Sequence, residues 1–288
     1  MSKKFIKAFI VSAVIASLFC TGGCRDGVSP AGDSKTEKAE SPAQITTKEL
    51  VYKRLEGKEL ACEVDMPAGV GPFPVVLYVH SWGGSLNQLK GYSQRMARRG
   101  IAGVRINYRR LSEGTEFADA KSDVEAAIDF IRGSSDEMNF DMSRFGMAGA
   151  SAGAVLSSLI CQYTPECKVF VAFNGGFDLL NKCESKFPGE QAAESMFPGV
   201  TEEKLRAASS IYNLRNNPPA SLLFHGSADE TISSEQARRF AEAVKNKGGS
   251  ARLELYEGRK HGFFNSNMPD FENIAGKLES FLVEEFDL

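Results

Sequence analysis

The chain has 288 residues, of which 42% are hydrophobic and 25% are charged, and its formal net charge is −3. These values are those of an ordinary globular protein, and they exclude a disordered, collagen-like or polytopic membrane chain. The mixed charge also argues against a nucleic-acid-binding protein, which would usually carry an excess of positive charge.

The first residues have the pattern of an export signal. Lysines precede an uncharged apolar stretch over residues 8–19, which is too short for a comfortable membrane span. The Thr-Gly-Gly-Cys sequence that follows is similar to a bacterial lipobox, although Thr21 stands where leucine is usual. We predict a lipoprotein-type signal peptide over 1–23 and lipid attachment at Cys24. The protein would then lie on the periplasmic or outer face of a membrane, and simple cleavage and secretion is the alternative.

Residues 24–47 are rich in Ser, Thr, Gly, Pro and Ala and contain almost no large apolar side chains. Such a segment cannot bury enough surface to offset the entropy of ordering, so it is predicted to be a flexible tether. Residues 48–288 are then expected to form one folded domain.

The exported part retains four of the six cysteines: Cys62, Cys161, Cys167 and Cys183. An oxidising compartment permits disulfides, with Cys161 and Cys167 the pair closest in sequence, but free buried thiols fit equally well. No CxxC motif or His/Cys cluster suggests a metal site, so no metal or other cofactor is expected.

The elements of the folded part alternate between strands and helices. A hairpin-like segment around Gly57 comes first, and apolar runs of strand length follow at 74–80, 101–108, 144–150, 168–175, 220–226 and 252–257. Helical patterns lie before Gly100 and over 119–132, 152–161, 234–249 and 271–286. This alternation predicts an α/β fold with a mostly parallel central sheet and helices on both faces.

The pentapeptide Gly149-Ala150-Ser151-Ala152-Gly153 fits the G-x-S-x-G pattern between an apolar strand and a helix. That is the context of a nucleophile elbow, where Gly149 and Gly153 support a sharp turn that exposes the serine. Ser151 is therefore the candidate nucleophile.

A serine nucleophile needs a base, and the base needs an acid that orients it. Asp229 follows the 220–226 strand and His261 follows the 252–257 strand, which gives the chain order Ser, acid, His typical of such sheets. Both lie after carboxyl ends of strands, where open α/β sheets place their sites. We therefore predict a triad of Ser151, Asp229 and His261. His225, at the end of its strand, is expected to support its loop.

A glycine-containing loop follows the 74–80 strand, with the sequence His80-Ser81-Trp82-Gly83-Gly84. Backbone N–H groups of Trp82, Gly83 and Ala152 are the candidate donors of an oxyanion hole. His80 is expected to hold the loop. Ser81 and Trp82 are expected to contact substrate, with simple loop packing as the alternative for Trp82.

Several segments resemble successive blocks of an α/β-hydrolase: FPVVLYVHSWGG, INYR, FADAKSDVEAAIDFIR, DMSRFGMAGASAG, HGSADETI and EGRKHGF. They are most similar to bacterial acetyl-xylan/feruloyl-esterase-like proteins, near the hormone-sensitive-lipase-like esterases, and the resemblance covers residues 50–287. It implies a serine carboxylesterase that acts on short-chain acyl esters, such as acetyl or feruloyl esters of sugars or polysaccharides.

The chain departs from this group in two ways. The usual His-Gly-Gly-Gly loop is replaced by the 80–84 sequence, and too few residues precede the 74–80 strand for a helical N-terminal cap. Segment 176–216 is the candidate substitute lid, or a packed connection. A prolyl-oligopeptidase-like peptidase and an inactive lipid-anchored binding scaffold are the alternatives to an esterase. A dienelactone-hydrolase-like function is disfavoured, because that group has cysteine where Ser151 stands.

Overall fold

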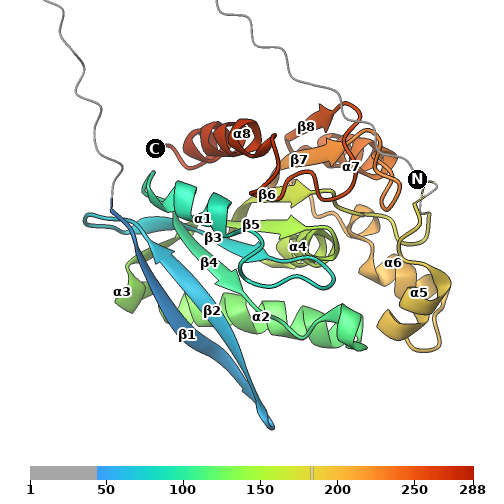
Figure 1. The fold of residues 1–288 in the computed structure, drawn as a ribbon, viewed down its shortest axis with the longest axis horizontal. Coiled ribbons are helices and arrows are strands. Elements are labelled where there is room, and N and C mark those ends of the chain that lie inside the picture. The colour runs from blue at the N-terminus through green and yellow to red at the C-terminus, as the bar shows by residue number, and fades with distance from the viewer. Residues whose placement is uncertain (1–43, 182, 184) are drawn as a thin grey trace, which may run out of the picture. The chain divides into compact units, whose positions relative to one another are not determined.

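An eight-stranded sheet forms the centre of the protein, with strand order β1-β2-β4-β3-β5-β6-β7-β8 (Figure 1). The structure is a computed structural model that describes residues 44–181, 183 and 185–288, all within one compact unit. The strands are β1 (Thr46–Leu55), β2 (Lys58–Met66), β3 (Phe73–Val79), β4 (Ala102–Ile106), β5 (Phe140–Ala150), β6 (Cys167–Phe173), β7 (Ala220–Gly226) and β8 (Ala251–Tyr256). β2 pairs antiparallel with β1 and β4, and the other neighbours are parallel. The predicted mostly parallel α/β sheet is confirmed.

Helices cover both faces of this sheet. In the described ranges they are α1 (Lys90–Ala97), α2 (Phe117–Gly133), α3 (Ser135–Met138), α4 (Ala152–Tyr163), α5 (Glu190–Met196), α6 (Glu202–Ala208), α7 (Glu235–Asn246) and α8 (Phe271–Glu285). Two short 3-10 turns, η1 (Leu111–Glu113) and η2 (Ser210–Tyr212), complete the set. Buried side chains of α2, α4 and α7 join one apolar cluster, and those of α1 and α8 join the other.

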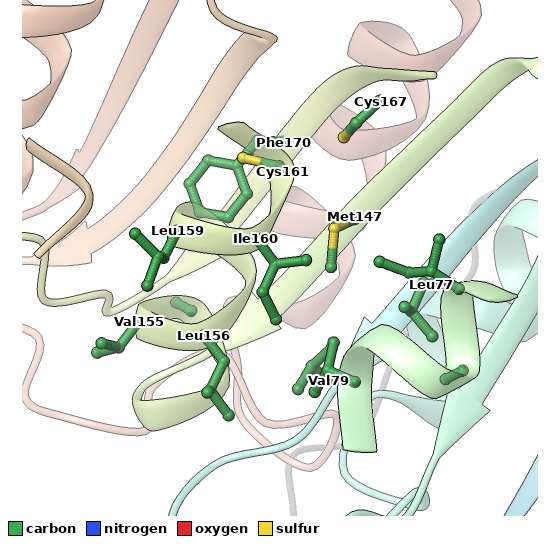
Figure 2. Packing of buried hydrophobic residues seen from close by; sticks show 14 of the residues in the cluster. Leu77, Val79, Met147, Val155, Leu156, Leu159, Ile160, Cys161, Cys167 and Phe170 are labelled. Carbon is green, nitrogen blue, oxygen red and sulfur yellow. The ribbon is translucent and has the colours of Figure 1, made fainter. Parts of the chain in front are cut away.

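Strand β3 shows why the central strands are apolar throughout. Val75, Leu77 and Val79 belong to the cluster under α4, whereas Val76 and Tyr78 belong to the cluster under α8. Figure 2 shows Leu77, Val79 and Met147 of the sheet facing the Val155–Ile160 stretch of α4. A parallel strand covered on both faces has no solvated side, so its sequence shows a continuous apolar run.

The N-terminal boundary of the fold differs slightly from the sequence prediction. β1 begins at Thr46, so Thr46 and Thr47 belong to the sheet and not to the tether. Thr47 pairs with Asp65 on β2, and its hydroxyl donates to the Asp65 carboxylate at 2.7 Å. The predicted signal peptide, Cys24 and the tether up to residue 43 lie outside the described residues and stay predictions. Within the ranges that the structure describes, no helix has the length and apolarity that crossing a membrane requires.

Segment 176–216, the candidate lid, packs as a helical connection between β6 and β7. It contains α5, α6 and η2, and it buries Met196, Phe197 and Ala208 against the α2–α4 face. The Phe197 ring lies 5.1 Å from the ring of Phe117 at the start of α2. The four cysteines of the described chain are all free thiols, so the disulfide alternative is not the one that the structure adopts.

Candidate active site

Ser151 occupies the turn between β5 and α4. Its φ of 51° and ψ of −115° are rare for a residue with a side chain, and its N–H donates to Phe173 O at 2.8 Å. Glycines make the turn possible, because a Cβ on Gly149 would lie 2.4 Å from Gly153 O. A Cβ on Gly153 would in turn lie 2.3 Å from the carbonyl oxygens of β3 and the following residue. The G-x-S-x-G segment therefore has the geometry of a nucleophile elbow.

The structure brings the three predicted triad residues together. His261 Nε2 lies 3.0 Å from Ser151 Oγ, and His261 Nδ1 lies 2.7 Å from Asp229 Oδ2. Ser151 and Asp229 are buried, whereas the His261 side chain is 24% exposed. A base in hydrogen-bond reach of a serine, and itself held by a buried carboxylate, is the arrangement that activates serine as a nucleophile.

Asp229 is held in place through both of its carboxylate oxygens. Oδ1 accepts the backbone N–H groups of Thr231 and Ile232, at 2.8 and 3.0 Å. Burial alone would raise the pKa of Asp229, but hydrogen bonds from His225 and His261 outweigh it and hold that pKa well below its usual range. The carboxylate therefore stays ionised and can stabilise a positive charge on His261.

Asn174 is a residue of the site that sequence reasoning missed. It directly follows β6, is fully buried, and donates its Nδ2–H to the same Asp229 Oδ2 atom that His261 contacts. His225 Nε2 lies 2.9 Å from Ile232 O and 3.4 Å from Asp229 Oδ2, so His225 contacts the acid loop, the 227–232 segment that carries Asp229. A polar residue just after a buried strand, at the edge where the triad collects, was the signal that could have revealed Asn174.

The 81–84 loop is a β-turn closed by Gly84 N–H to Ser81 O at 3.0 Å. The Ser81 N–H is already used, because it donates to Gln88 Oε1 at 2.8 Å. Trp82 and Gly83 occupy the two central positions, and their N–H groups have no acceptor among the described residues. These two N–H groups are available to a substrate oxygen, whereas the Ser81 N–H is not.

His80 packs beneath this turn as a neutral ring. It stacks on Tyr108 with ring centroids 4.2 Å apart, and its Nδ1 lies 2.8 Å from Ser81 O. The Tyr108 hydroxyl donates to His80 O at 3.0 Å. Burial lowers the pKa of His80 to about 4, so this imidazole is uncharged near neutral pH and supports the turn.

Trp82 also meets the segment that was a candidate lid. Its ring contacts that of Phe187 edge-on, with centroids 5.4 Å apart. The backbone N–H groups of Lys186 and Phe187 both donate to Thr231 O at 3.0 Å, two residues after Asp229. The loop that carries Asp229 thus holds the backbone of Phe187, whose ring packs against Trp82 of the turn.

A separate apolar cavity of about 430 Å³ lies between α2, α4, α5 and α6, and none of the triad residues lines it. In the part of the chain that the structure describes, no group of three His, Cys, Asp or Glu side chains is placed to hold a metal ion.

The fold and the arrangement of Ser151, His261 and Asp229 define an α/β-hydrolase. Within this class, the chain belongs to the BD-FAE family, whose sequence profile matches residues 63–244.

Curated relatives of the chain are named as esterases. The probable isoprenylcysteine alpha-carbonyl methylesterase ICMEL1 of Arabidopsis thaliana is 27% identical over 225 residues, which is 66% of this chain and 46% of that protein. Esterase LipC of Mycobacterium tuberculosis is 29% identical over 224 residues, which is 69% of this chain and 55% of that protein. The chain spans about half the length of these relatives.

Similar solved structures include esterase 2 of Thermogutta terrifontis phosphonylated by sarin. It has a TM-score of 0.73 and 25% identity, and the match covers 84% of this chain and 94% of that one. The butyrate-bound form of that esterase matches with a TM-score of 0.71, 25% identity and the same coverage. These matches confirm the α/β-hydrolase fold that the sequence blocks predicted.

Proposed function

We propose that this protein is a serine carboxylesterase. The observation that carries the proposal is the continuous hydrogen-bonded relay from Ser151 Oγ through His261 to the buried carboxylate of Asp229. The esterase names of its relatives, together with its membership of the BD-FAE family, support ester hydrolysis as the reaction.

The proposed reaction gives each of these groups a role. His261 Nε2 takes the proton of Ser151 as Oγ attacks the ester carbonyl, and the N–H groups of Ala152, Trp82 and Gly83 stabilise the negative charge that develops on the carbonyl oxygen. His261 then protonates the departing alcohol, which leaves an acyl group on Ser151. Water repeats the same steps and releases the acid. Asp229 holds the imidazole and stabilises its positive charge throughout.

The proposed substrates are short-chain acyl esters, including acetyl or feruloyl esters of sugars and polysaccharides. The matching structures include propionate-bound and butyrate-bound forms of Thermogutta terrifontis esterase 2, which supports a short acyl chain. The contact between Trp82 of the turn and Phe187 supports a substrate site that aromatic side chains restrict on one side.

The test is hydrolysis of p-nitrophenyl esters from acetate to decanoate by the full chain, with acetylated xylan and methyl ferulate alongside. We expect activity that peaks at acetate to butyrate, and we expect Ser151→Ala to lower kcat by at least about 10⁴-fold without unfolding the protein. Paraoxon, which is named as phosphorylating the Thermogutta esterase, should modify Ser151 in the wild type and leave the variant unmodified. A folded wild type that hydrolyses no ester, or an active Ser151→Ala variant, would contradict the proposal.

A further inference from the structure

Among the described residues, the Asn174 side chain forms a hydrogen bond only with Asp229, the acid of the triad. Its Nδ2 donates to Asp229 Oδ2, while its Oδ1 is buried and has no partner there. A buried amide kept only for packing would have both ends satisfied or would be replaced by an apolar group. In Asn174, by contrast, Oδ1 has no partner among the described residues and Nδ2 donates to Asp229.

The backbone fixes Asn174 in this position. Its φ is 51°, in the left-handed region that Asn adopts more readily than most side chains, and its N–H donates to Phe224 O at 2.9 Å on the neighbouring β7. β6 lies between β5, which carries Ser151, and β7, which leads to Asp229. The residue after β6 therefore faces the middle of the triad.

We infer that Asn174 is a positioning residue: its side-chain N–H fixes Asp229 Oδ2 so that this oxygen stays in line with His261 Nδ1. The inference rests on the proposed esterase function. Two backbone N–H groups hold Oδ1, and Asn174 with His261 holds Oδ2, so rotation of the carboxylate is blocked at both oxygens.

The Asn174 side chain is neutral, and this neutrality matters as much as its position. The titratable groups that face Asp229 are His225 from β7 and His261 from the loop after β8. Glu230, next to Asp229 in the chain, forms an exposed ion pair with Lys186. A neutral donor steadies the carboxylate without supplying a second positive charge that would compete with the imidazolium of His261. Removing the donor would leave more negative charge on Oδ2, which would hold the proton on His261 more strongly.

The test compares Asn174→Gly and Asn174→Asp in the full chain. Glycine adopts the positive φ without strain, so Asn174→Gly removes the side chain alone. We expect kcat to fall about 10- to 100-fold with KM changed less than about twofold, because the lost contact orients the base and does not bind substrate. The acidic limb of the kcat/KM profile should also move to higher pH.

Asn174→Asp replaces the donor with a second carboxyl group against Asp229. The two cannot both ionise easily, so the new carboxyl keeps its proton and can donate at low pH, and it repels Asp229 once it ionises. The Asn174→Asp variant should therefore keep its activity at low pH, where the new carboxyl is protonated, and lose it as the pH rises. The backbone control is Asn217→Gly, because Asn217 also has a positive φ of 49° but is exposed, and glycine adopts that φ without strain. It should leave kcat and the pH profile unchanged.

A second measurement does not need turnover. The Nδ1 proton of His261 should give a downfield NMR resonance that is lost in His261→Gln, and it should shift or broaden in Asn174→Gly and titrate with pH in Asn174→Asp. An unchanged resonance, or a pH-independent loss of kcat in both variants, would overturn the inference. If the wild type hydrolyses no ester, the proposed function fails, and the NMR result still decides whether Asn174 positions Asp229.

Discussion

At the scale of single residues, backbone strain marks the site. Six described residues other than glycine have a positive φ, and only Ser151 and Asn174 among them are buried. They follow adjacent parallel strands, β5 and β6, and both contact the His261–Asp229 pair. Strained conformations persist where the surrounding structure enforces them, and they cluster at functional sites.

His80 makes a residue-scale prediction about pH. The folded chain keeps this ring neutral down to about pH 4, whereas an exposed histidine takes up its proton near pH 6.5. The unfolded chain thus binds more protons between these values, so His80 makes the free energy of unfolding fall as pH drops through that window. The loss from His80 should be about 2 kcal/mol between pH 7.5 and pH 5.0.

Urea unfolding at the two pH values measures this effect in the wild type and in His80→Asn. The asparagine amide can still donate to Ser81 O in place of Nδ1, but it does not titrate. The free energy of unfolding of the variant should depend less on pH by the same amount. Equal pH dependence in the two proteins would show that His80 is not held neutral.

At the scale of elements, Gly153 sets how closely α4 approaches β3. Because a Cβ there would lie 2.3 Å from Val79 O and His80 O, Gly153→Ala forces the helix and strand apart. We expect the free energy of unfolding to fall by about 1–3 kcal/mol, as overpacking of a tight core usually costs, with a loss of esterase activity. Chemical unfolding and the p-nitrophenyl acetate assay measure the two effects.

Gly133 is the matched control for this substitution. It lies at the end of α2 and a Cβ there would meet nothing within 4 Å. Gly133→Ala should therefore be neutral or stabilise the protein by about 0.4–1 kcal/mol, chiefly by restricting the unfolded chain. If both alanine variants behave alike, close packing at Gly153 is not what fixes the elbow.

The elements also show what could be predicted from the sequence. Runs such as 74–80 and 220–226 predicted central strands, because strands buried on both faces must be apolar, and the chain order of Ser151, Asp229 and His261 predicted residues that the structure places in contact. Segment 176–216 has no comparable periodicity, so α5 and α6 were not predicted. Asn174 was not assigned: a lone polar residue after a buried strand indicates a place at the carboxyl ends of the strands, but it does not indicate which side chain that residue contacts.

At the scale of the whole molecule, strand order assembles the site. β5, β6, β7 and β8 are successive neighbours in the sheet, so the segments after their carboxyl ends meet at one edge. These segments carry Ser151, Asn174, Asp229 and His261, one after each strand. Residues 110 positions apart in the sequence, Ser151 and His261, therefore share a hydrogen bond.

Thiol reactivity reports on the integrity of the whole fold. Cys62, Cys161 and Cys167 are fully buried, and burial raises the pKa of the Cys62 thiol to about 12. Cys183, by contrast, is partly exposed beside Arg239.

With Cys20→Ser and Cys24→Ser in place, an aromatic disulfide reagent should modify one thiol quickly in the native protein. The other three of the four free thiols should react only on global unfolding, without reductant. Cys183→Ser should abolish the fast phase. Fewer than four thiols in the unfolded chain would show a disulfide and contradict the prediction.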